Sequence, residues 1–260
     1  MPARVDQQST TQYREWTPTP AVERAVVCLW TRDAGDDYAS FAHTVIPDNC
    51  ADIILRLSPD GGVGDAYVVG PMSSPIVVRG LRAGRHIGVR FRPGWAPSLL
   101  RVAGRDLRDE RIPLIDIWPS LSRALRHVEV KHADDAVAAF GRVLGAHLTQ
   151  RGEPPVSVRG ALRRLEETRG RVSIGALCAE LRVTRQHLAR LFDEHVGLRP
   201  KFFSRVARLH HVIERVRKEA GGALSWSALA FDAGYADQSH LVGDFTELTG
   251  ASPSVWAGAR

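Results

Sequence analysis

Hydrophobic residues follow two different spacings along this chain. Between residues 21 and 94, short runs rich in Val and Ile alternate with Gly, Pro and Asp, a pattern that predicts the strands of an antiparallel sheet. The runs are Val26–Thr31, His43–Asp48, Asp52–Ser58, Ala66–Pro71, Pro75–Gly80 and His86–Pro93. We therefore expect a β-rich N-terminal domain, folded as a sheet or a cupin-like barrel.

After this region the spacing of apolar residues becomes helical. Trp95–Val102 predicts a short helix, and the apolar pattern between Pro119 and Leu148 predicts further helices, which can also pack between the protomers of a homodimer. Gln150–Ala161 is rich in Pro, Gly and charge, as linkers commonly are. The expected fold class is therefore α+β, with strands first and an all-α region last.

This reading divides the chain into consecutive segments. The polar N-terminus, which ends in Pro18 and Pro20, predicts a flexible arm. The predicted segments are the arm at 1–20, the β-rich domain at 21–118, a helical connector and linker at 119–158, and the all-helical domain at 159–260.

Two similar patterns lie between residues 172 and 254, and each predicts a short helix, a tight turn and a second helix. Ser173 and Ser225 can N-cap the first helix of each pair, and Thr184 and Asp237 can N-cap the second. A helix pair of this kind places a row of side chains in the major groove of DNA. We call the pair within 172–201 the first reader and the pair within 224–254 the second reader.

The second reader resembles the signature of the AraC family of bacterial transcription regulators. The matching residues are Ala230, Gly234, Tyr235, Gln238, Ser239, Phe245, Gly250, Ser252 and Pro253. The resemblance covers residues 170 to 258 and implies a domain that carries two helix-turn-helix motifs and binds double-stranded promoter DNA. It also implies contact with RNA polymerase, since activation is the commoner outcome in the family, although the sequence does not decide between activator and repressor.

The β-rich region resembles an uncharacterised N-terminal domain that is fused to some AraC-type modules in bacteria. The segments that carry this resemblance are Pro47–Ile53, Val69–Leu81 and Gly88–Arg101. It implies a sensory or regulatory domain for a small-molecule effector, and no chemistry. Asp48, Cys50 and Asp52 are the candidate ligand-binding residues at the mouth of a pocket. Alternatively, Asp48 makes a turn and Asp52 caps a strand.

In the second helix of the first reader, helical geometry separates an inward face from an outward face. The inward positions are Leu188, Leu191 and Phe192. The outward positions are Gln186, Ala189 and Arg190, and the resemblance puts the base-contacting positions on this same face. Arg can bind guanine, Gln can bind adenine and Ala can meet a thymine methyl group. Thr184, Arg185 and His187 complete the predicted DNA contacts, and the alternative for the outward face is solvation alone.

The second reader departs from the family pattern. Its predicted DNA-binding residues are Asp237, Gln238, Ser239, Val242 and Gly243. Basic or polar residues are usual where this chain has Val242, Gly243 and Asp244, and none of these three attracts a phosphate. We therefore expect a weaker contact between the second reader and DNA.

A long helix over Pro200–Lys218 is predicted to join the readers and set their separation, ideally about 34 Å, one turn of DNA. Arg205 and Arg208 on this helix are candidate phosphate contacts, and Arg208 also matches a position where the family commonly has a structural Arg.

Charge differs sharply between the two halves of the helical domain. The whole chain carries a net charge of +6, which favours a polyanionic partner. Residues 171–218 contain eleven Lys and Arg against four acids, whereas residues 219–260 contain one Arg against five acids. We therefore expect the first reader and the joining helix to supply nearly all of the salt-dependent binding.

Composition narrows the class of protein. A hydrophobic content of 44% suits a soluble globular protein, and no apolar run reaches the roughly 18 residues of a membrane span. The polar N-terminus predicts no signal peptide. The three widely spaced cysteines Cys28, Cys50 and Cys178 argue for a reducing cytoplasm and against a disulfide framework or a zinc knuckle.

No phosphate-binding Gly-rich loop, His-Glu-x-x-His motif or nucleophile elbow is present, so we expect no enzyme, cofactor or metal. Two alternatives stay open. One is a metal-binding cupin-like enzyme that uses His43, Cys50 and His86. The other is an interaction module whose DNA-binding domain is vestigial.

Overall fold

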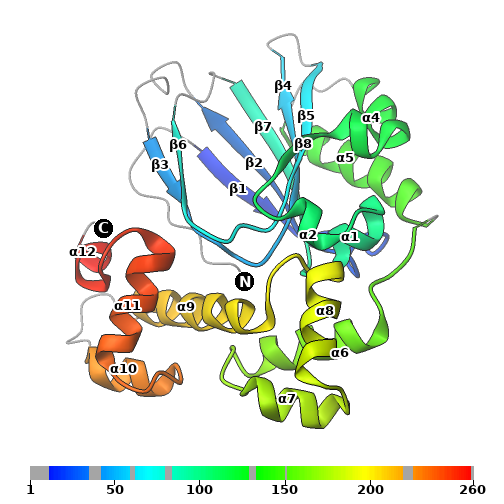
Figure 1. Cartoon of the computed structure of the whole chain (residues 1–260). Helices are drawn as coiled ribbons and strands as arrows, with labels where there is room; N and C mark the ends of the chain where they lie inside the picture. The colour runs from blue at the N-terminus through cyan, green and yellow to red at the C-terminus, as the bar shows by residue number, and fades with distance from the viewer. Residues whose placement is uncertain are drawn as a thin grey trace.

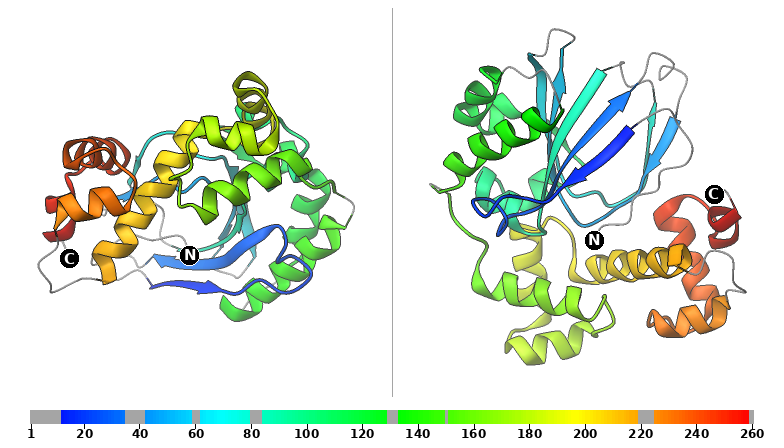
Figure 2. Two further views of the ribbon diagram at one scale, coloured as in Figure 1. Left: turned by 90° about the horizontal axis from the view of Figure 1, so that it is seen from below. Right: turned by 180° about the vertical axis from the view of Figure 1, so that it is seen from behind.

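The structure is a computed structural model of the chain, and it describes residues 12–34, 42–58, 62–79, 84–128, 133–149, 151–218 and 225–258. An antiparallel β domain comes first and a helical domain follows, as predicted (Figure 1). The helical domain lies along one end of the β domain and is divided in two by the long helix α9, Pro200–Lys218 (Figures 1 and 2).

The β domain contains two sheets. The larger has the strand order β1-β2-β7-β4-β5-β8 and the smaller pairs β3 with β6. The strands are β1 (Gln12–Trp16), β2 (Val26–Ala34), β3 (Ala42–Val45), β4 (Asp52–Leu57), β5 (Val63–Val69), β6 (Ile76–Arg79), β7 (Gly84–Phe91) and β8 (Arg111–Pro113). All pairings are antiparallel, and each of the six predicted runs overlaps one of these strands.

One face of the larger sheet is buried in a hydrophobic core. Along β4 the side chains alternate, so that Ile53, Leu55 and Leu57 are buried while their neighbours are partly exposed. Helices cover this face, and β3 and β6 lie on the other side of the sheet (Figure 1). The covering elements are α1 (Trp95–Leu100), α2 (Gly104–Leu107), α3 (Leu114–Ile117), α4 (Pro119–Arg126) and α5 (Ala133–Leu148).

One prediction for this domain needs correction and another is narrowed. The end of the predicted flexible arm forms β1, because Gln12–Trp16 pairs with β2 along the edge of the sheet. The apolar residues of α4 and α5, such as Leu121 and Phe140, are buried in the core of their own domain. Only the outer faces of these helices are therefore left for the predicted packing between protomers.

The helical domain contains α6 (Val156–Glu167), α7 (Ile174–Leu181), α8 (Arg185–His195), α9, α10 (Trp226–Asp232), α11 (Gln238–Thr249) and α12 (Pro253–Gly258). Because α6 begins at Val156 and buries Val158, the extended linker is shorter than predicted and the helical domain starts before residue 159. Helices α6 to α8 share one apolar cluster with the start of α9, and α10 to α12 share another with the rest of α9.

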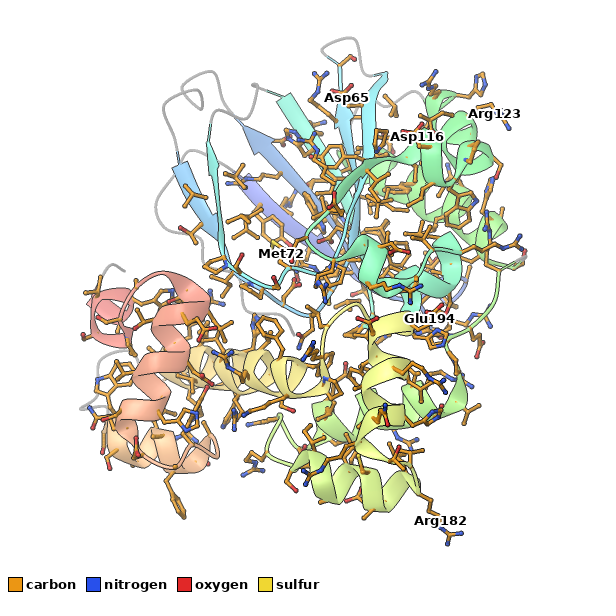
Figure 3. All side chains as sticks on the ribbon, in the orientation of Figure 1. Asp65, Met72, Asp116, Arg123, Arg182 and Glu194 are labelled. Atoms are coloured by element: carbon orange, nitrogen blue, oxygen red, sulfur yellow. The ribbon has the colours of Figure 1, made fainter. Side chains whose placement is uncertain are left out.

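The β domain contacts both parts of the helical domain. Gly104 packs so closely on Gly197 that a Cβ at Gly104 would lie 2.3 Å from the Gly197 nitrogen. Arg105 of α2 pairs with Glu194 at the end of α8, and Glu194 faces α2 in Figure 3. Asn49 donates to the Phe203 carbonyl of α9 at 3.1 Å. In the described part of the chain, no helix is long and apolar enough to cross a membrane.

Candidate nucleic-acid interface

The first reader is formed by α7 and α8, and both predicted caps are present. The Ser173 hydroxyl accepts from the Ala176 amide at 3.1 Å, and the Thr184 hydroxyl accepts from the His187 amide at 3.1 Å. Arg182 ends α7 in a left-handed conformation (φ 55°), which turns the chain into α8. Both helices therefore start at the cap that the sequence predicts.

The two faces of α8 are those expected from helical geometry. Leu188 and Phe192 are fully buried, and Leu191 is partly buried against the same cluster. The outward positions Gln186, Ala189 and Arg190 are exposed. Arg190 contacts the His187 ring nitrogen Nδ1 at 3.1 Å, which places these two side chains together near the start of α8.

Around this face the first reader carries exposed cations. They are Arg182, Arg185, Arg190, Arg199 and Lys201. Within the described ranges, none of them forms an ion pair with a carboxylate. Arg182 extends away from α7 at the far edge of the molecule in Figure 3. These side chains are therefore available to a polyanion.

The second reader, formed by α10 and α11, has the same construction. Ser225 accepts from the Ala228 amide at 3.3 Å, and Asp237 accepts from the His240 amide at 2.8 Å. Leu241 and Phe245 are buried, as predicted. Among the proposed contacts, Asp237, Gln238, Ser239 and Gly243 are exposed, whereas Val242 packs partly against the cluster below it.

The acids of the second reader bind the joining helix. Asp244 is only 7% exposed, and its carboxylate lies 2.9 Å from Arg205 Nε and 3.6 Å from Arg208 Nη2. Arg205 also pairs with Glu247. Arg208 lies over the Tyr235 ring at 4.7 Å. Both arginines therefore anchor α11 to α9, and their role as phosphate contacts stays a prediction.

His211 of α9 links the segment after α6 to the second reader. Its Nδ1 lies 2.8 Å from Arg169 Nη1 near the end of α6, and its Nε2 lies 3.0 Å from Asp232 Oδ2 of α10. Because the Arg169 guanidinium can only donate hydrogen bonds, His211 Nδ1 is the acceptor. The hydrogen of the neutral ring is therefore on Nε2, which donates to Asp232. Burial lowers the pKa of His211, which agrees with a neutral ring.

In the β domain the three candidate ligand residues Asp48, Cys50 and Asp52 line one pocket. Both carboxylates pair with the buried Arg90, at 3.2 and 3.3 Å from Nε. Asp48 also accepts from the Cys50 amide at 3.0 Å, so it does make the turn that was the alternative interpretation. Burial raises the pKa of the Cys50 thiol, which disfavours a reactive thiolate.

Sequence reasoning missed most other residues of this pocket, among them Trp30, Arg90 and His210. The alternation of His86, Gly88 and Arg90 along one strand was a signal that polar groups share a face. No local signal pointed to His210, which is on α9. Among the described residues, no group of three or more His, Cys, Asp or Glu could hold a metal ion, and the side chain of His43 lies outside those residues.

Family models match two parts of the chain. A model described as a helix-turn-helix domain matches residues 177–259, and one described as a domain of unknown function (DUF6597) matches residues 14–113. No curated protein matches the chain.

Solved structures of ToxT from Vibrio cholerae are similar over nearly the whole chain at low identity. The apo form of a ToxT variant is 11% identical with a TM-score of 0.45, and the match covers 98% of this chain and 99% of that chain. ToxT with a bound unsaturated fatty acid is 11% identical with a TM-score of 0.43, and the match covers 98% and 97% of the two chains. No residue role is carried over from these structures.

Proposed function

Because its C-terminal residues form an AraC-type helix-turn-helix domain, we propose that this protein is a transcription regulator that binds promoter DNA sequence-specifically. One observation carries the proposal. The outward face of α8 exposes Gln186, Ala189 and Arg190 together, beside cations that no carboxylate in the described part of the chain neutralises. A helix face that only contacts water needs neither side chains that can read bases nor unpaired positive charge, so their combination favours DNA binding.

In this proposal the first reader provides the main contact. Arg190 and Gln186 contact bases, Ala189 meets a thymine methyl group, and Thr184, Arg185 and His187 lie beside the phosphates and sugars. The second reader contributes Asp237, Gln238, Ser239, Val242 and Gly243, which offer shape and polar contact without positive charge.

The β domain is proposed to sense a small-molecule effector through the pocket that Asp48, Cys50 and Asp52 line. Activation through contact with RNA polymerase is the proposed outcome. All three cysteines are free and buried, which supports a reducing, cytoplasmic location.

Binding-site selection tests this function. The purified full-length protein is incubated with random double-stranded DNA, and bound sequences are enriched over several rounds. We expect a defined motif with half-sites about one DNA turn apart. Binding without any motif points to an interaction module that only attracts polyanions, and no binding at low salt rejects DNA recognition.

A further inference from the structure

The larger sheet has a second face, which the hydrophobic core does not use. The register pairs Arg32 with His86 and His86 with Arg56, so these side chains share one face across β2, β7 and β4. The next row on that face consists of Trp30, Gly88 and Ile54. It is the face opposite the core residues Ile53 and Val89.

A pocket of about 260 Å³ lies on this second face. Its floor includes Trp30, Ile54 and Tyr67 of the larger sheet, and Val78 of β6 closes the side opposite the floor. Met72 points into the space between the two sheets in Figure 3. Most of the lining is therefore aromatic or aliphatic, as in ligand sites generally.

Gly88 shapes the floor of the pocket. A Cβ at this position would lie 1.9 Å from Trp30 Cε2, so only glycine lets the indole ring lie across β7. The indole nitrogen donates to Asp52 Oδ1 at 3.1 Å, which holds the ring in place. The pocket thus has a built aromatic surface.

His86 is a buried polar residue beside this aromatic surface. It is 5% exposed, and no group in the described ranges bonds its Nδ1. Burial, together with the positive charges of Arg32, Arg56 and Arg111, lowers the pKa of His86 to about 4. The ring is therefore neutral at pH 7, and its surroundings favour negative charge in a neighbour.

Arg111 of β8 also lines the pocket, in the row of Val69 and Asp52, and its positive charge acts on His86. Its guanidinium is stacked 3.7 Å from the centre of the Tyr67 ring, and within the described ranges it forms no ion pair with a carboxylate. Arg90 of β7 already meets two carboxylates, Asp48 and Asp52, and is not available to a further anion. An anionic group is therefore attracted to the space between His86 and the Arg111 guanidinium over Tyr67 and is repelled by Asp48 and Asp52.

We propose that this pocket binds a compact apolar molecule with one anionic oxygen group, which His86 Nδ1–H and Arg111 hold. With about 260 Å³ of space, the cavity is of the size that binds small molecules. The apolar body lies on Trp30, Ile54 and Met72. This inference names the effector class of the sensory site and rests on the proposed function.

The pocket also reaches the DNA-binding domain. His210 of α9 lines it, and its Nε2 donates to the Pro47 carbonyl at 2.7 Å. The next residue, His211, joins the segment after α6 to the second reader through Arg169 and Asp232. A ligand that moves the Pro47–His210 contact therefore changes the position of the helix on which both readers are mounted.

Ligand binding is tested without DNA, by calorimetry on the full-length protein with phenylacetate, phenylacetamide and 2-phenylethylamine. These probes share an aromatic body and differ in the charge of the polar group. We expect phenylacetate to bind at least about tenfold more tightly than the amine, because a charge-assisted hydrogen bond forms only with the anion. Equal binding of the three, stronger binding of the amine, or no binding of phenylacetate overturns the ligand class.

Variants locate the site. His86→Leu and the surface change Arg111→Gln should each weaken phenylacetate binding by about tenfold. His127→Leu, a matched change at the exposed end of α4, should leave it unchanged. If His86→Leu does not fold, the Arg111→Gln variant alone tests whether the anion binds at this site. Unchanged binding in Arg111→Gln places the anion elsewhere and overturns the proposal.

The connection to DNA is tested with a selected operator. Saturating phenylacetate should change the Kd for DNA about fivefold or more, and His210→Leu should reduce this change by a larger factor than it weakens phenylacetate binding. A Kd that phenylacetate does not alter overturns the route through α9. If the protein binds no DNA, the proposed function fails while the calorimetric result stands. If it binds DNA but no probe, only this inference fails.

Discussion

The two readers share one construction and differ in how their charges are used. In both, a capped short helix precedes a capped second helix with a buried apolar face. The cations of the first reader point to solvent, whereas Asp244 and Glu247 of the second reader bind Arg205 of α9. The acidic side chains Asp244 and Glu247 therefore attach the second reader to the joining helix.

This difference changes how the charge asymmetry is interpreted. A count of charges placed Asp244 on the surface, where it would repel DNA. In the structure it is buried between Arg205 and Arg208, so replacing it with Arg would crowd three guanidinium groups and destabilise the second reader. Arg205 and Arg208 of the joining helix are already paired with these acids, so we expect the first reader to supply most of the salt dependence of binding.

The largest expected effect is on the anchor of the second reader. Asp244→Asn keeps the shape but leaves Arg205 and Arg208 without their shared carboxylate. We expect a loss on the order of 3 kcal/mol in the free energy of unfolding, because breaking a buried ion pair leaves its partners uncompensated. Urea denaturation measures it.

The matched control is Glu247→Gln, since the Glu247 side chain is 62% exposed. It should cost less than about 1 kcal/mol. Equal losses in the two variants would mean that Asp244 is not the anchor.

Base reading by the first reader comes next. Arg190→Ala should cost about 1–3 kcal/mol of specific binding and relax the preference at one or two base pairs. Gln238→Ala at the second reader should alter sequence preference only slightly. Binding-site selection followed by titration compares the two, and an undiminished wild-type motif with Arg190→Ala would show that the reading face is assigned wrongly.

Salt dependence separates the readers further. Replacing Arg185 and Arg190 by Gln should reduce the slope of log K against log salt by about 0.9 for each lost phosphate contact. Gln238→Ala should leave that slope unchanged. Affinity is measured at several salt concentrations, and a flatter slope with Gln238→Ala would show that both readers engage the phosphates equally.

The smallest expected effect concerns the link between the readers. Burial lowers the pKa of His211 in the folded protein, so the unfolded chain binds its proton more readily. The contribution of His211 to stability is thus fully present above its unfolded-state pKa of about 6.5. It is lost as the pH falls from there towards the folded-state pKa. Arg169, which donates to His211, opposes its protonation, whereas Asp232 favours it.

Unfolding measured between pH 7.5 and 5 should show a decline that is smaller in His211→Gln. This variant should also tolerate altered spacing between half-sites. An identical decline in both proteins would assign the pH dependence to other groups.

Much of the fold could be predicted because its determinants are local. A strand run needs alternating or apolar residues over a few positions, and a cap such as Thr184 bonds an amide three residues away. These signals located six strands, the short helix α1 and both readers. They did not reveal β1, β8, α2 or α3, which are short or polar and depend on neighbours far away in the chain, as β8 depends on β5.

Only the tertiary structure decided which distant residues meet. Arg90, His86 and His210 come from β7 and α9, and no periodicity relates a strand to a helix so far along the chain. Likewise, an acid at position 244 has the same local pattern whether it faces solvent or Arg205. Local bonding determined where the readers begin and which faces are apolar. Long-range packing decided which charges are left for DNA and which residues enclose the pocket.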